Sequence, residues 1–354
     1  MKKIAFLLLV VLLLAACSQP ENASEEPTDA SSEETADTTD ASASAELDVF
    51  TTAYPLAYFT ERIGGERVNV QSIYPPGSNE HTFEPTQQDM VKLAEADLLF
   101  YIGLGLEGFI DSAENTLSGE DVKLIATSNA ISDEELESGQ LHEEEAEDAH
   151  SEEETQDEHA DEEGHEEESG AEDSHDEHGH GSIDPHVWIS PVLSQKLAES
   201  IKDSLVEADT EGAEMYEENY EELVSELQQL DESYQALASS TENKTFFVSH
   251  DAFGYIADTY GFEQVPVAGL NSQDEPSQKE LTAIVDLAKE KNIEHIAFEQ
   301  NVSSKLAEVI QNEVGAEAVE LHNLSVLTPE NEDNDETYFT LMEKNLKTLE
   351  TMLK

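Results

Sequence analysis

The chain is poor in cysteine and in basic residues, which excludes disulfides within the chain and disfavours anionic partners. Cys17 is the only cysteine in 354 residues, so no disulfide can form within the chain. Only 16 residues are Lys or Arg against 82 Asp or Glu, which gives a formal net charge of -66. Such a surface repels nucleic acid and anionic lipid, so neither is expected as a partner, whereas cations are attracted. Long apolar runs are scarce too, and the one at residues 4–16 is too short to span a membrane comfortably.

That apolar run has the plan of an export signal, because Lys2 and Lys3 precede it and Cys17 follows it directly. Residues 14–17 read LAAC and resemble the lipobox of bacterial lipoproteins. The resemblance implies a signal peptide at residues 1–16. It also implies a lipidated Cys17 that anchors the protein to the outer face of the bacterial cell membrane, an extracytoplasmic location. A free thiol in an uncleaved signal is the alternative.

Two stretches carry much of the negative charge. Residues 18–48 hold ten Asp or Glu and no Lys or Arg, and residues 133–180 hold 24 and none. Both lack the apolar surface needed to fold, so residues 17–46 are predicted to be a disordered tether and residues 133–180 a disordered loop. The loop contains seven histidines that we expect to bind metal ions weakly: His142, His150, His159, His165, His175, His178 and His180.

The rest of the chain alternates short apolar runs with helical patterns, which predicts an α/β fold with parallel sheets. An N-terminal lobe is predicted at residues 47–210 and a C-terminal lobe at residues 240–354. The predicted strands are 47–51, 68–73, 97–102 and 122–126, then 245–250, 264–267, 295–298 and 318–321. The predicted helices are 55–63, 86–96 and 107–117, then 252–260, 277–291, 303–314 and 336–353.

A long helix is predicted at residues 211–239 between the two lobes. Its apolar residues follow alternating spacings of four and three, which places them on one face: Tyr216, Tyr220, Leu223, Leu227, Leu230, Tyr234 and Leu237. Packing along both lobes would make the joint rigid and leave the protein a monomer. A coiled-coil dimer is the alternative.

Three widely separated histidines indicate one metal site. His81 and His186 lie in loops whose backbones are fixed by Pro and Gly, and His250 ends an apolar run that indicates a buried strand. Each histidine alone could be a surface or structural residue. Parallel sheets place ligands beyond the carboxyl ends of their strands, which puts His81 and His250 in the cleft between the lobes. Three imidazoles favour zinc over manganese, whose sites are richer in carboxylate and water.

The three histidine segments together resemble those of a known family. They are residues 80–86, which read EHTFEPT, residues 184–188, which read DPHVW, and residues 249–255, which read SHDAFGY. They are similar to the metal-binding segments of the zinc-uptake lipoproteins of bacterial ABC transporters. The resemblance covers residues 47–354 and implies two α/β lobes joined by a long rigid helix, with Zn²⁺ between them. It also implies delivery of zinc to an ABC permease and its ATPase, without catalysis.

The fourth ligand is not settled by this resemblance. Many members of the family take it from a carboxylate just after the last strand, where residues 321–326 of this chain read LHNLSV and contain no Asp or Glu. Glu80, a water or, third, Glu299 would then complete the shell. His295 and His322 are interpreted as structural or surface groups.

Two other classes of function remain open at this point. A zinc-dependent hydrolase would use the open position of a three-ligand site, with Glu80 or Glu84 as general base. No H-E-x-x-H helix motif is present to support it. A surface metal buffer or an adhesin active in cell adhesion would instead use the histidine-rich stretch.

Overall fold

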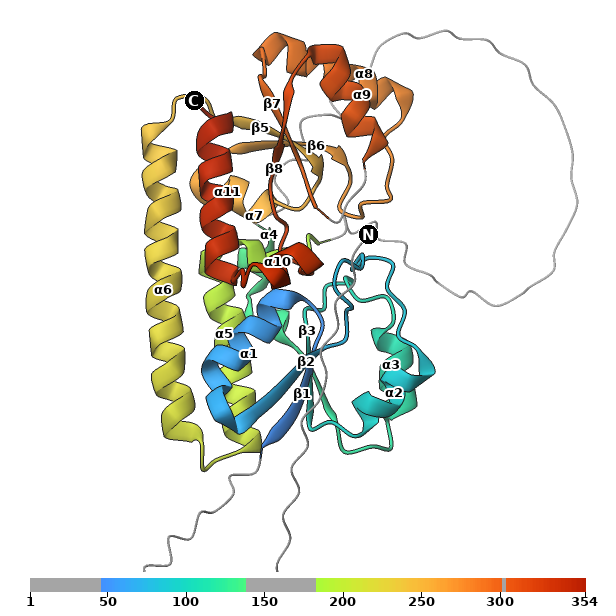
Figure 1. The fold of residues 1–354 in the computed structure, drawn as a ribbon, viewed down its shortest axis with the longest axis vertical. Coiled ribbons are helices and arrows are strands. Elements are labelled where there is room, and N and C mark those ends of the chain that lie inside the picture. Colours follow the sequence, from blue (N-terminus) through green and yellow to red (C-terminus); the bar gives the residue numbers. More distant parts are fainter. Residues whose placement is uncertain (1–45, 138–182, 301–303) are drawn as a thin grey trace, which may run out of the picture. The chain divides into compact units, whose positions relative to one another are not determined.

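The computed structural model describes residues 46–137, 183–300 and 304–354, which belong to one compact unit, residues 44–354 (Figure 1). The predicted signal peptide, Cys17, the tether up to residue 45 and the seven histidines of the acidic loop lie outside the described residues. In the described ranges, no helix combines the length and the apolar composition that crossing a membrane requires.

The N-terminal lobe contains a four-stranded parallel sheet in the order β2-β1-β3-β4. Its strands are β1 Leu47–Thr51, β2 Val68–Ser72, β3 Leu98–Tyr101 and β4 Lys123–Ala126. The connections are helices α1 Tyr54–Gly64, α2 Gln87–Ala94 and α3 Ile110–Leu117, with short 3₁₀ turns η1 Gly65–Arg67 and η2 Thr127–Ala130. Strand β1 pairs with a neighbour on each side, Val49 facing Val70 and Leu98, and is therefore central in the sheet.

The C-terminal lobe repeats the plan with a parallel sheet in the order β6-β5-β7-β8. Its strands are β5 Thr245–His250, β6 Glu263–Ala268, β7 His295–Phe298 and β8 Glu317–Glu320, connected by helices α7 Gly254–Tyr260, α8 Gln278–Lys291 and α9 Lys305–Val314. Every residue of β5 is buried, as expected for the central strand of a sheet with both faces covered. The predicted α/β fold with two parallel-sheet lobes is confirmed.

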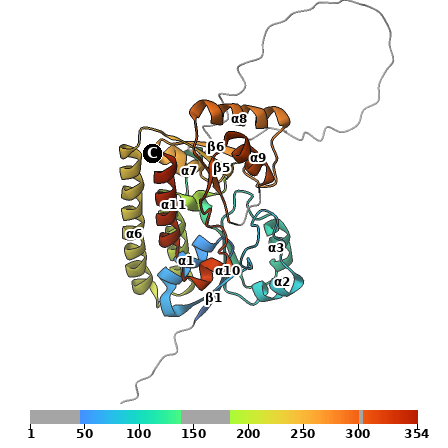
Figure 2. The same cartoon turned by 45° about the horizontal axis from the view of Figure 1, so that its top comes forward.

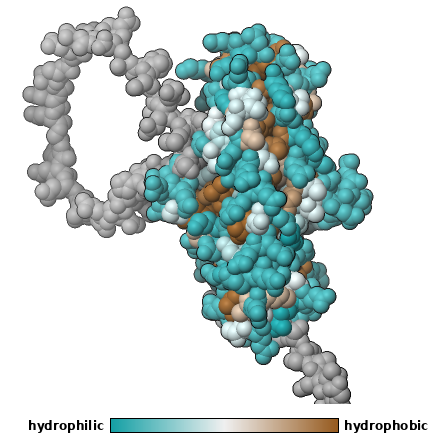
Figure 3. All heavy atoms as spheres, turned by 90° about the vertical axis from the view of Figure 1, so that its left-hand side faces the viewer, coloured by the Kyte–Doolittle hydropathy of each residue, from teal (hydrophilic) through white to brown (hydrophobic). Residues whose placement is uncertain are grey.

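The predicted long helix is α6 Ala213–Ser240, whose 28 residues rise about 42 Å at 1.5 Å each. It packs against α1, against α5 Pro191–Ala208 and against α11 Tyr338–Met352, and it also touches α7 of the other lobe. Six of the seven residues of its apolar stripe are buried, Tyr220 being the exception. The chain's own helices therefore cover the stripe, and the face on the α6 side is mostly hydrophilic with separate apolar patches (Figure 3). A coiled-coil dimer, the alternative, would need an exposed apolar stripe on α6, and no such stripe remains.

Helix α5 was not among the predicted elements. Its buried residues include Leu193, Leu197, Ile201 and Leu205, a single row at spacing four with polar residues elsewhere. Ser190 caps it by accepting from the backbone N–H of Leu193 at 3.3 Å, and Pro191 occupies its first position. Both end signals were present in the sequence.

The chain returns to the N-terminal lobe after β8. Along the return segment, residues 321–327, the carbonyl of Ser325 accepts from the Tyr54 N–H at 2.8 Å and that of Leu327 accepts from the Gly77 N–H at 2.9 Å. Helix α10 Pro329–Asp333 and helix α11 follow. The Tyr338 ring of α11 packs edge-on against Phe59 of α1, with centroids 5.0 Å apart, and both views place α11 beside α6 (Figures 1 and 2). The last helix thus contacts the first lobe.

The predicted disorder of residues 133–180 was wrong for the first five, which form helix α4 Asp133–Glu137. Ser132 and Glu135 cap one another: the Glu135 carboxylate accepts from the Ser132 N–H at 2.9 Å, and the Ser132 hydroxyl accepts from the Glu135 N–H at 3.4 Å. Leu136 is buried against the core. The high negative charge of residues 133–180 predicted disorder, but it gives no information on a single helix cap and a single buried leucine.

Candidate metal centre

His81 lies in the loop between β2 and α2. Its backbone N–H donates to the Asn79 side-chain oxygen at 3.0 Å, and the Asn79 amide donates to the Ser272 hydroxyl of the other lobe at 3.1 Å. Gly77, at φ 76°, allows the tight turn just before it. The His81 side chain is 6% exposed, so the loop carries the ring inward.

His186 precedes the 3₁₀ turn η4 Val187–Ile189 and is fully buried. One oxygen of Asp184 accepts from the His186 backbone N–H at 2.8 Å and lies 2.8 Å from ring Nδ1. This bond places the proton on Nδ1 and leaves Nε2 as the free ligand atom. The Tyr255 hydroxyl donates to the Asp184 carbonyl at 2.8 Å, so the C-terminal lobe also holds this segment.

His250 is the last residue of β5 and is fully buried. Its Nδ1 lies 2.9 and 3.1 Å from the two oxygens of Glu299, which follows the adjacent strand β7. Because Val248 pairs with Ala297, the carboxyl ends of β5 and β7 meet and bring the two side chains together. The Ser249 hydroxyl donates to Glu299 at 3.1 Å, and the carbonyl of Leu270 lies 3.1 Å from His250 Nε2.

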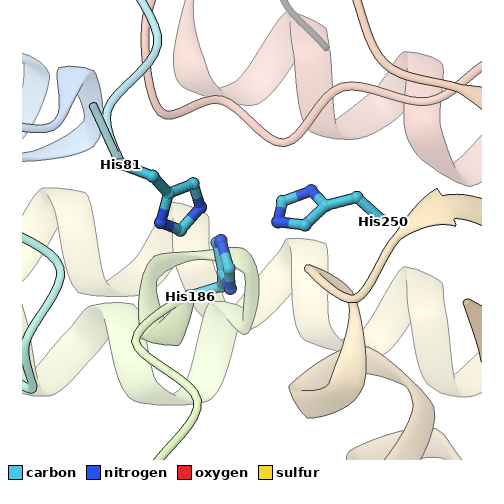
Figure 4. A group of neighbouring side chains, drawn as sticks. All are labelled: His81, His186 and His250. Atoms are coloured by element: carbon cyan, nitrogen blue, oxygen red, sulfur yellow. The ribbon is translucent and has the colours of Figure 1, made fainter. Parts of the chain in front are cut away.

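The three imidazoles converge between the lobes (Figure 4). Their ring centroids are 5.4, 5.4 and 4.9 Å apart, and one ligand atom of each lies within 4.8 Å of the others. A tetrahedral zinc with bonds of about 2.0–2.1 Å holds its nitrogens about 3.4 Å apart, so each pair must close by about 1.4 Å or less. The Nε2 atoms of His81 and His186 are buried without a hydrogen-bond partner, as ligand atoms of a metal would be.

The electrostatics differ among the three rings. Burial, with repulsion from His186 and His250, lowers the pKa of His81 to about 3, and burial also lowers the pKa of His186. Burial alone would lower the pKa of His250, but the Glu299 carboxylate outweighs it and raises that pKa to about 9. His81 and His186 therefore rest neutral at pH 7, the form that binds metal, whereas His250 rests as a cation that donates from both nitrogens.

Of the carboxylates considered for a fourth ligand, Glu80 lies at the ring cluster. Its side chain is buried, Oε1 is 3.9 Å from His81 Nε2 and accepts from the Asn323 amide at 3.1 Å, and Oε2 has no partner. Burial raises the pKa of Glu80. Both oxygens of Glu299 instead face His250 Nδ1, where they orient the ring.

The remaining histidines of the described ranges lie elsewhere. His322 Nε2 is 3.0 Å from Glu320, and its backbone bonds to the Asn345 side chain, so its role is structural. Within the described ranges, His81, His186 and His250 are the one group of three or more metal-capable residues. The sequence interpretation missed Asp184 as the partner of His186, although an Asp two residues before a histidine and next to proline is a recognisable turn signal.

The fold and the site together define a metal-binding α/β protein with its site between two lobes. Each lobe has a parallel sheet, and two buried imidazole nitrogens without hydrogen-bond partners lie beside a third imidazole ring. The family model described as zinc-uptake complex component A, periplasmic, matches residues 49–352, and the chain belongs to this family.

The relatives agree with this membership. The high-affinity zinc uptake system protein ZnuA of Bacillus subtilis (strain 168) is 36% identical over 307 residues, which cover 87% of this chain and 88% of that protein. The zinc-binding lipoprotein AdcA of Streptococcus pneumoniae (strain ATCC BAA-255 / R6) is 33% identical over 352 residues, 99% of this chain. The chain spans 60% of the length of AdcA. The crystal structure of the Zn(II)-bound ZnuA-like domain of Streptococcus pneumoniae AdcA matches with a TM-score of 0.65 and 30% identity, over 87% of this chain and 99% of that one.

Proposed function

We propose that this protein captures Zn²⁺ outside the cytoplasm and delivers it to an ABC permease whose ATPase partner drives import. His81, His186 and His250 supply three neutral nitrogens, and Glu80 supplies the fourth ligand through Oε2. The observation that carries the proposal is the pair of buried, unpartnered Nε2 atoms beside a third imidazole, between two lobes of a family of zinc-uptake components.

The ligand set favours zinc on chemical grounds. Imidazole nitrogen suits zinc, whereas manganese prefers carboxylate and water, and three nitrogens with one carboxylate oxygen complete a tetrahedron. Zinc bound here would carry a local charge of one positive unit after Glu80 ionises. The Asp184 and Glu299 carboxylates behind His186 and His250 stabilise the bound cation further and fix both ring orientations.

Capture without catalysis fits the enclosure of the site. A catalytic zinc keeps an open position for water and substrate. Here the side chains of His81, His186 and His250 are 6%, 0% and 0% exposed, so the rings have little contact with solvent. Ligands from both lobes also make release possible, because a small shift of one ligand segment distorts the tetrahedron.

The location follows from the proposed lipid anchor at Cys17. A protein held on the outer face of the cell membrane by this residue would meet extracellular zinc and remain close to its permease. The acidic lobes attract cations to the site by long-range electrostatics.

Zinc titration of single variants tests the proposal. We expect His81→Ala, His186→Ala and His250→Ala each to lose most of the zinc affinity, because each removes one of four ligands, and to fail to restore growth in chelated medium. His295→Ala is the matched control, since that ring lies outside the cluster, and it should bind zinc as the unaltered protein does. Normal affinity in any of the first three would remove that residue from the site.

A further inference from the structure

Asn323 occupies a buried junction in the return segment after β8, where both ends of its side-chain amide and its backbone carbonyl form hydrogen bonds. Its Oδ1 accepts from the Ser325 N–H at 3.0 Å and from the Ser325 hydroxyl at 2.9 Å. Its Nδ2 donates to Glu80 Oε1 at 3.1 Å, and its carbonyl accepts from the Trp188 indole N–H at 2.6 Å. Because two donors from Ser325 face Oδ1, the orientation of the amide is fixed, and Nδ2 must point at Glu80.

These bonds link one residue to two metal-binding segments. Glu80 is the neighbour of His81, and Trp188 lies two residues after His186. The next residue, Leu324, is held at φ 61°, a left-handed conformation that a leucine adopts only under tight constraint. The return segment thus contacts the segments of two of the three clustered histidines.

The bond to Glu80 decides how that carboxylate can bind a metal. With Oε1 accepting from a neutral amide, only Oε2 is free, and Oε2 is buried without a partner. A carboxylate presenting one oxygen completes a four-coordinate shell, whereas two oxygens would raise the coordination number toward that of manganese sites.

We propose that Asn323 is a positioning residue that limits Glu80 to one-oxygen coordination and thereby sets the preference of the site for zinc over manganese. This inference rests on the proposed zinc-binding function, with Glu80 as fourth ligand.

The informative variant is Asn323→Asp, which has nearly the same shape. An aspartate keeps the acceptor for Ser325 and the carbonyl that accepts from Trp188, but it replaces the donor to Glu80 by a second carboxylate oxygen. The two carboxylates repel unless a cation binds both, so the site becomes richer in oxygen. Asn323→Ser serves as a second variant, because it removes the same donor without adding charge.

Asn331→Asp is the matched control. Asn331 is also buried and belongs to the same C-terminal stretch, but its side-chain oxygen caps α10 by accepting from Thr328. The substitution adds the same charge and keeps that cap.

The measurements are zinc and manganese affinities by competition with a chelator, and the visible spectrum of the cobalt-loaded protein, whose intensity reports tetrahedral geometry. Asn323→Asp should lower the zinc-to-manganese affinity ratio at least about tenfold, the size expected when a residue that orients a ligand is changed. Its cobalt bands should weaken. Asn323→Ser should shift both readouts in the same direction, and Asn331→Asp should shift neither. Unchanged ratio and spectrum in a folded Asn323→Asp or Asn323→Ser protein would overturn the inference.

A double-mutant cycle separates this inference from the proposed function. If Asn323 acts through Glu80, Asn323→Ser, which adds no carboxylate of its own, should change the ratio little in a Glu80→Gln background. An undiminished effect in that background would refute the positioning role while leaving the three-histidine site intact. Failure of the unaltered protein to bind zinc, or a silent His250→Ala, would instead refute the proposed function.

Discussion

Zinc binding should expel one proton from His250, and the structure sets the pH range. In the metal-free protein the two nitrogens of this ring donate to Glu299 and to the Leu270 carbonyl, and its pKa is raised to about 9. Zinc must take Nε2, so the proton and the metal compete for one atom. The neighbouring His81, with a pKa of about 3, and His186, whose pKa is lowered, are already neutral and add no proton near pH 8.

The expected magnitudes follow from that pKa. From His250, zinc should release about one proton at pH 7.5, about half at pH 9 and about a quarter at pH 9.5, as the cationic fraction of this ring falls. Burial raises the pKa of Glu80, and any proton that this ligand loses on binding zinc adds to the total. At pH 7.5 the competition weakens zinc binding about thirtyfold, or about 2 kcal/mol, relative to neutral His250. Measurements should stay above pH 7.5, because burial raises the pKa of Asp184 to about 7. The pH window for His250 is therefore centred near 9 and not near 6.5, the ordinary value for an imidazole.

Calorimetric titration of zinc in buffers with different ionisation enthalpies gives the proton count directly. Glu299→Gln removes the carboxylate that raises the pKa of His250, so the release at pH 7.5 should fall by nearly one proton. Glu320→Gln, which removes a carboxylate paired with His322 outside the site, should leave the count unchanged. A count near zero in the unaltered protein, or one insensitive to Glu299→Gln, would refute this reasoning.

Four further outcomes are expected. Asp184→Ala should weaken zinc binding about tenfold to a hundredfold, because the His186 ring loses its orienting partner; an unchanged affinity in chelator competition would contradict this. Leu227→Ala, at a fully buried position of α6, should lower the free energy of unfolding in urea by about 2–5 kcal/mol, and a change below 1 kcal/mol would show that α6 is loosely packed. Cys17→Ser should move the protein from membranes to the soluble fraction; persistent membrane association after a high-salt wash would argue against the lipid anchor. Deleting residues 142–180 should lower the zinc stoichiometry but leave one tight site, and losing that site would place the histidine-rich stretch within it.

The fold was largely predictable because its central strands carry short clusters of apolar residues. β1, β5 and β7 begin and end at the predicted residues, since burial in the sheet requires apolar residues that stand out from the polar loops on either side. Helix α5 was not predicted because it buries one narrow row of residues at spacing four, and this apolar pattern is weak among the polar residues around it. Helix α4 was not predicted because the acidic composition of the stretch gives no sign of its cap or of its one buried leucine.

The candidate site was predictable only in part, and the reason is sequence distance. His81, His186 and His250 could be found because each stands in a recognisable local context. Their hydrogen-bond partners could not be found so easily: Glu299 is 49 residues from His250, and Asn323 is 243 residues from Glu80. Parallel strand order brings the first pair together and the return segment brings the second, and neither arrangement can be derived from local patterns.

The way the lobes are fastened limits how zinc can leave. Helix α6 packs on both lobes, the return segment bonds to Tyr54 and Gly77, and the Tyr255 hydroxyl ties the His186 segment to the C-terminal lobe. A wide hinge opening would break all of these contacts at once. Of the three ligand side chains, only that of His81 is even slightly exposed, and its loop is tied to the C-terminal lobe near the site through the Asn79 to Ser272 hydrogen bond. Because this is the side with solvent exposure, zinc exchange is expected there, and displacing the loop would break the Asn79 to Ser272 and Asn323 to Glu80 hydrogen bonds while His186 and His250 remain in place.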